Sequence, residues 1–60
     1  MRPNADIRKK AKANGVYLWK IADRMGMHDS NFSRLLRKEL PADRKEEIFQ
    51  IIDDLARKEA

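Results

Sequence analysis

The chain has 60 residues, with 14 lysines and arginines against 10 aspartates and glutamates, a formal net charge of +4 and no cysteine. A chain this short forms one small domain, and its core has no room for a cofactor cavity of ordinary size. Without cysteine, a disulfide framework and a thiolate metal cage are both excluded. No signal peptide is recognisable and no apolar run approaches the length of a membrane span, so we expect a soluble cytoplasmic protein.

The charge is unevenly distributed along the chain. Residues 1–40 carry ten basic and four acidic side chains, whereas residues 41–60 carry four basic and six acidic ones. The excess of positive charge in the first part favours a polyanionic partner such as nucleic acid. Solubilising cations without any partner are the alternative that charge alone leaves open.

The first predicted helix covers roughly residues 5–14. Asn4 is a candidate N-cap, and Asp6 places negative charge in the first turn, where the helix dipole favours it. Ile7 and Ala11 are four residues apart and therefore share one face. Gly15 supplies the positive φ angle that ends such a helix.

Two further helices are predicted at roughly residues 17–25 and 29–38. The first has an apolar stripe at helical spacing, made of Leu18, Ile21, Ala22 and Met25. In the second, His28 or Asp29 can act as the cap, and the inward side chains are Phe32, Leu35 and Leu36. Pro41 interrupts the chain after Leu40.

The last predicted helix covers roughly residues 42–58, and its apolar residues are Ile48, Phe49, Ile51, Ile52, Leu55 and Ala56. No segment alternates with a period of two, so the fold class is all-α, a compact four-helix domain. Because no apolar stripe can be buried alone, the four stripes should close on one another. The predicted core is Ile7, Ala11, Val16, Leu18, Ile21, Ala22, Met25, Met27, Phe32, Leu35, Leu40, Ile48, Ile51, Ile52 and Leu55.

Residues 18–37 satisfy the requirements of two helices that cross through a short turn. Ala22 is small where the second helix packs across the first, and Gly26 tolerates the positive φ angle of the turn. The helix that follows has a basic outward face. This combination is typical of a helix-turn-helix.

The stretch LWKIADRMGMHDSNFSRLLR, residues 18–37, resembles the helix-turn-helix of phage-repressor-like (Xre/Cro-type) DNA-binding proteins. With the flanking helices, residues 4–56 resemble small regulators of phages and integrative elements in Gram-positive bacteria. The resemblance implies a sequence-specific transcriptional regulator that binds double-stranded DNA, commonly as a homodimer. The chain departs from this pattern at Leu18, where a polar phosphate contact is usual, and at Tyr17, where Thr or Ser is the usual cap. It also has four helices where five are common.

The resemblance implies that the third helix enters the major groove. The residues that map onto its base-reading face are Asp29, Ser30, Arg34 and Arg37, and Arg34 is the one suited to bidentate contact with guanine. Asp29 has a helix cap as its simpler role, since its charge repels phosphate. The residues assigned to phosphate are Tyr17, His28, Ser33 and Lys38; simple solvation is the alternative for His28.

Other functions have weaker support in the sequence. One histidine, no cysteine and no glycine-rich phosphate loop predict no catalytic residue, no metal site, no cofactor and no small-molecule substrate. The serious alternative is a helical interaction module that binds a repressor, recombinase or antitoxin. Trp19 could stack on nucleobases, but packing over the core or near the last helix is the interpretation preferred here. Phe49 and Ala56 exceed what one core-facing stripe requires and could form a dimer patch.

Overall fold

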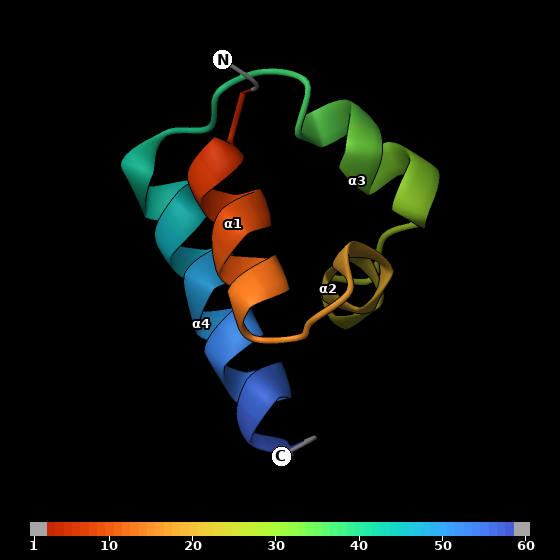
Figure 1. The fold of residues 1–60 in the computed structure, drawn as a ribbon. Helices are drawn as coiled ribbons and strands as arrows, with labels where there is room; N and C mark the ends of the chain where they lie inside the picture. Colours follow the sequence, from red (N-terminus) through yellow and green to blue (C-terminus); the bar gives the residue numbers. More distant parts are fainter. Residues whose placement is uncertain (1–2, 59–60) are drawn as a thin grey trace.

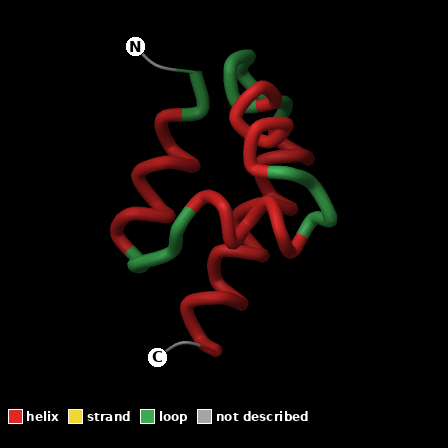
Figure 2. The backbone as a smooth tube through the Cα atoms, turned by 90° about the vertical axis from the view of Figure 1, so that its right-hand side faces the viewer, coloured by secondary structure: helices red, strands yellow, loops and turns green. Residues whose placement is uncertain are grey.

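The computed structural model describes residues 3–58, which form four α-helices and contain no strand (Figures 1 and 2). The helices are α1 (Ala5–Ala13), α2 (Leu18–Arg24), α3 (Asp29–Leu35) and α4 (Ala42–Lys58). α1 lies along α4, while α2 contacts both α3 and α4 (Figure 1). The all-α class and the compact four-helix architecture are confirmed. None of the helices in this part of the chain is long and apolar enough to span a membrane.

The buried core draws on all four helices and on the α1–α2 loop. Its apolar members are Ile7, Ala11, Val16, Ile21, Ala22, Phe32, Leu36, Ile48 and Ile52. Leu36 is the one member missing from the predicted core. Seven predicted members are only half-buried against this core: Leu18, Met25, Met27, Leu35, Leu40, Ile51 and Leu55. A domain of this size leaves much of its apolar surface at the edge, because few positions are enclosed on every side.

The start of α1 differs from the predicted cap. Asn4 occupies the N-cap position, but its side chain makes no capping hydrogen bond and its backbone is left-handed, with φ 58°. Its carbonyl accepts from the amides of Ile7 and Arg8 at 3.1 and 3.2 Å. Asp6 Oδ1 accepts a second bond from the Ile7 amide at 3.0 Å. The Asn4 side chain is thus free to bond elsewhere in the molecule.

The third helix is shorter than predicted, because α3 ends at Leu35 with Leu36 as its C-cap. The Asn4 carboxamide bonds the segment that follows the helix. Its Nδ2 donates to the carbonyls of Leu36 and Lys38, at 3.0 and 2.8 Å, and its Oδ1 accepts from the Leu40 amide at 2.9 Å. In a continued helix, the Leu40 amide would donate to the Leu36 carbonyl. Asn4 bonds both of these groups instead, which stabilises the non-helical conformation of residues 36–40.

Candidate functional site

The turn between α2 and α3 is closed by backbone hydrogen bonds. The amides of Gly26 and Met27 donate to the carbonyls of Asp23 and Ala22, at 3.0 and 2.9 Å. Gly26 has φ 71°, as the sequence predicted, and this left-handed residue reverses the chain direction. Ala22 is fully buried, as a close approach of the two helices requires. Figure 1 shows α2 along its axis and α3 from the side, so the two helices cross.

All eight predicted site residues are exposed to solvent. They are Tyr17, His28, Asp29, Ser30, Ser33, Arg34, Arg37 and Lys38. Four of them lie on α3, namely Asp29, Ser30, Ser33 and Arg34, whereas Arg37 and Lys38 follow its end. The predicted helical position of Arg37 and Lys38 is therefore wrong. The turn formed there holds them next to α3, since the Arg37 amide donates to the Arg34 carbonyl at 3.2 Å.

Neither residue offered as a cap for α3 makes a side-chain capping bond. His28 occupies the N-cap position with extended backbone. The Asp29 carboxylate instead accepts from the Ser30 amide at 2.9 Å. Tyr17 likewise stands at the N-cap of α2 without a capping bond. The side chains of Tyr17 and His28 therefore do not stabilise the helix starts at which they stand.

The charges of the chain divide into paired and unpaired groups. Lys10 pairs with Asp53, and Arg24 and Arg57 both pair with Asp54, so acidic groups of α4 neutralise cations of α1, α2 and α4 itself. Arg34, Arg37 and Lys38 have no acidic partner within residues 3–58. Their positive charges are exposed and uncompensated, which makes this segment attractive to a polyanion.

A second cluster holds the segment after α3 in place. Lys45 of α4 pairs with Glu39 and, at 3.0 Å, with Asp6, while Glu39 Oε1 accepts from the Asn4 amide at 2.9 Å. The hydrogen bond from Lys45 lowers the pKa of Asp6, and the bond from the Asn4 amide lowers the pKa of Glu39. The hydrogen bonds to Glu39 and Asp6 raise the pKa of Lys45. These charges join α1, α4 and the segment carrying Arg37 and Lys38.

The aromatic pair at the start of α2 is exposed, and Trp19 is more exposed than predicted. Tyr17 is 65% and Trp19 55% exposed, and their rings stack with centroids 6.4 Å apart. Trp19 does not cover the core, so that interpretation is wrong. It does line a surface groove together with Leu55 of α4, which accords with the predicted position near the last helix.

The two residues of the proposed dimer patch lie at the edge of the core. Phe49 and Ala56 are half-buried against the core, and the Lys10 ammonium lies 5.3 Å from the Phe49 ring centroid. Within residues 3–58, no group of three or more His, Asp or Glu side chains is placed to hold a metal ion.

Comparison with known proteins returned no relative. The chain matches no protein-family model, no curated protein sequence and no solved structure at a significant level.

Proposed function

We propose that the protein is a sequence-specific DNA-binding regulator in which α2 and α3 form a helix-turn-helix and α3 enters the major groove. The observation that carries this proposal is the set of uncompensated cations at the C-terminal end of α3 and just after it, namely Arg34, Arg37 and Lys38. The α2–α3 turn, closed by backbone hydrogen bonds, supports it. Cations that contact the DNA phosphates increase affinity, and exposed side chains on a helix in the major groove provide sequence preference.

The roles of the individual residues follow from their positions. Arg34 lies near the end of α3 and is suited to bonding guanine through both O6 and N7, with Asp29, Ser30 and Arg37 as further base-reading candidates. Tyr17, His28, Ser33 and Lys38 are proposed to contact phosphate. A homodimer on a two-fold site would double the short recognition surface of one domain. Transcriptional control in a mobile element and a cytoplasmic location belong to the same proposal.

Selection from random DNA by the purified protein, followed by titrations at several salt concentrations, tests the proposal. We expect one enriched sequence whose affinity exceeds that for random DNA by ~10³-fold or more, with log affinity falling linearly with log salt. A protein that enriches no sequence, or that binds all sequences alike, would contradict the proposal.

The second candidate function is a helical interaction module for a regulatory protein partner. The stacked and exposed Tyr17–Trp19 pair favours it, because exposed aromatic side chains are enriched in protein interfaces. In that case, Trp19→Ala would abolish partner binding, whereas Arg34→Ala would leave it intact. The DNA proposal predicts the opposite dependence for binding to the selected site.

A further inference from the structure

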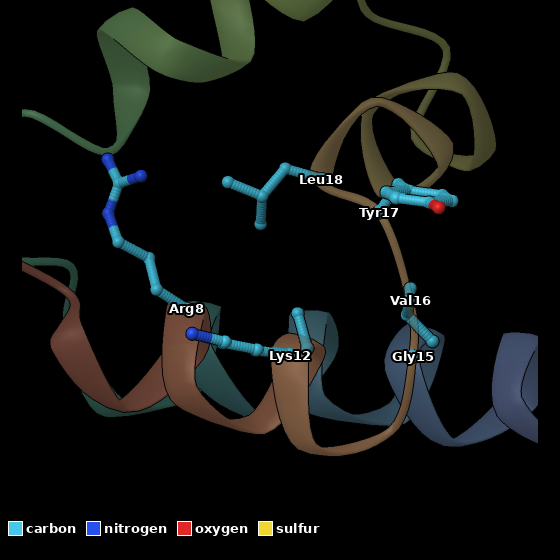
Figure 3. A pocket seen from close by; sticks show the side chains of 7 residues that line it. Arg8, Lys12, Gly15, Val16, Tyr17 and Leu18 are labelled. Atoms are coloured by element: carbon cyan, nitrogen blue, oxygen red, sulfur yellow. The ribbon is translucent and has the colours of Figure 1, made fainter.

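A groove opens between α1 and the start of α2. Of the residues proposed above to contact bases or phosphates, it is lined only by Tyr17. It encloses about 350 Å³. Figure 3 shows the Arg8, Lys12 and Leu18 side chains at this groove, with the Arg8 guanidinium extending from α1 toward the chain at the end of α3. The hydrogen bonds from Asn4 to Leu36 and Lys38, close to Arg8 at the start of α1, bring the same two segments together.

Two positive charges lie one helical turn apart in this groove. Arg8 and Lys12 have no acidic partner among residues 3–58. The Arg8 Nε atom is also buried and makes no hydrogen bond. Like charges at this spacing repel each other, and a buried donor without an acceptor is unfavourable. An anion in the groove would neutralise the repulsion between the two cations.

The remaining walls of the groove are apolar. Ala11 and Val16 are buried and Leu18 is half-buried, and all three line it. A nucleic-acid backbone presents a charged phosphate flanked by the carbon atoms of its sugars. The cations can bond the phosphate oxygens, for which the planar guanidinium is well suited, while the apolar walls contact the neighbouring sugar.

We infer that the groove formed by Arg8, Lys12 and Leu18 binds a phosphate group. The source of this phosphate is the backbone of duplex DNA, and this assignment rests on the proposed function. α1 thereby takes part in DNA binding, and the contact area extends from α3 across the segment at residues 36–40 to α1. No sequence signal distinguishes Arg8 from its neighbours in the basic run 8–12, since only the fold places it in the groove.

The first experiment tests the phosphate site without DNA. Inorganic phosphate is titrated into ¹⁵N-labelled protein, and the NMR signals of the Arg8 Nε–H group and of the backbone amides at residues 15–18 are followed. We expect these signals to shift saturably. In Arg8→Gln, which has no guanidinium, and in Lys12→Gln, the shift of the backbone amides at residues 15–18 should be abolished. Lys9→Gln is the matched control, because Lys9 is exposed on α1 and does not line the groove. Equal shifts in all three variants would overturn the inference.

The second experiment identifies the source of the phosphate. Duplex binding is titrated at several salt concentrations for the same variants, after their circular dichroism spectra have been matched. Arg8→Gln and Lys12→Gln should weaken selected and random DNA by the same factor and reduce the salt slope by about one, while Lys9→Gln leaves the slope unchanged. Duplex binding that is insensitive to Arg8 and Lys12 would overturn the groove inference and leave the DNA proposal standing. A phosphate-induced shift in a protein that binds no duplex would support the site, assign it to free phosphate compounds and refute the DNA proposal.

Discussion

The carboxamide of Asn4 bonds the Leu36 carbonyl and the Leu40 amide, two backbone groups that would bond each other in a continued helix. The Leu40 amide donates to Asn4 Oδ1 at 2.9 Å, while the Leu36 carbonyl, four residues earlier, accepts from Asn4 Nδ2 at 3.0 Å. A residue near the chain start therefore bonds the backbone that follows α3. It also holds the segment with Arg37 and Lys38, which the proposed function needs at the end of α3.

Replacing Asn4 should be among the most damaging single changes to stability. Asn4→Ala leaves buried backbone groups without partners and puts a Cβ-bearing residue other than Asn at φ 58°, so we expect a loss of about 2–4 kcal/mol. Asn4→Gly is the control, because it loses the same hydrogen bonds but accepts the backbone angle. Denaturant unfolding measures both variants. A free energy of unfolding unchanged in Asn4→Ala would refute the role assigned to the carboxamide.

The ion cluster of Asp6, Glu39 and Lys45 predicts that the stability of the fold decreases at both acid and alkaline pH. The pKa values of Asp6 and Glu39 are lowered from ordinary values of 3.8 and 4.5, so their stabilisation is present above those values and is lost as the pH falls through the lowered pKa. The pKa of Lys45 is raised from 10.5, so its contribution is present below that value and is lost as the pH rises through the raised pKa.

Lys45→Met tests this assignment in thermal melts between acid and alkaline pH. We expect the variant to lose less stability than the wild type on acidification, because its carboxylates have lost their cation. Lys9→Met is the control for the loss of one exposed charge. An acid limb as steep in Lys45→Met as in the wild type would count against the cluster.

Ala22→Leu should destabilise the crossing of α2 and α3. Ala22 is fully buried in a packed core, and three additional carbon atoms there cost about 1–3 kcal/mol by overpacking. Ala13→Leu makes the same chemical change at an exposed position of α1 and should be close to neutral. Melting temperatures that fall equally in both variants would show that no close packing exists at Ala22.

Substitutions at Gly26 measure the free-energy cost of the backbone conformation in the α2–α3 turn by itself. A Cβ built at Gly26 meets no atom within 4 Å, so Gly26→Ala introduces no clash and the φ of 71° alone opposes it. We expect a loss of about 1–2 kcal/mol for Ala. Gly26→Asn should lose less, because Asn adopts this conformation more readily. Unfolding experiments that rank Ala above Asn in stability would contradict the assigned turn geometry.

Arg34 and Lys38 should differ in how they affect DNA binding. Arg34→Ala removes a proposed base contact and should cost about 1–3 kcal/mol on the selected site with little loss on random DNA. Lys38→Ala removes a proposed phosphate contact and should weaken both alike, with the salt slope reduced by about one. Titrations on both DNA types distinguish the two patterns. If the two variants behave identically, α3 does not read bases in a groove.

Local signals in the sequence determined the helices and most of the core. Gly15 and Gly26 marked positions with positive φ because glycine alone adopts that angle without strain, and the apolar spacing identified eight of the nine buried apolar residues. The exposure of all eight candidate site residues also followed from their place opposite the apolar stripes.

The tertiary structure alone decided the features that depend on contacts between distant residues. Asn4 reads locally as a cap, but its partners are 32 to 36 positions away, and no periodicity reveals a bond over that separation. The same bonds stabilise a non-helical segment after Leu35, where the sequence predicted that the helix continues to residue 38. Trp19 remains exposed because α4 supplies only the edge of a groove beside it. Arg8 lines a groove only because the fold brings the start of α2 to face α1. A sequence pattern shows which face of a helix is apolar, whereas the packing of the other helices decides which part of that face is covered.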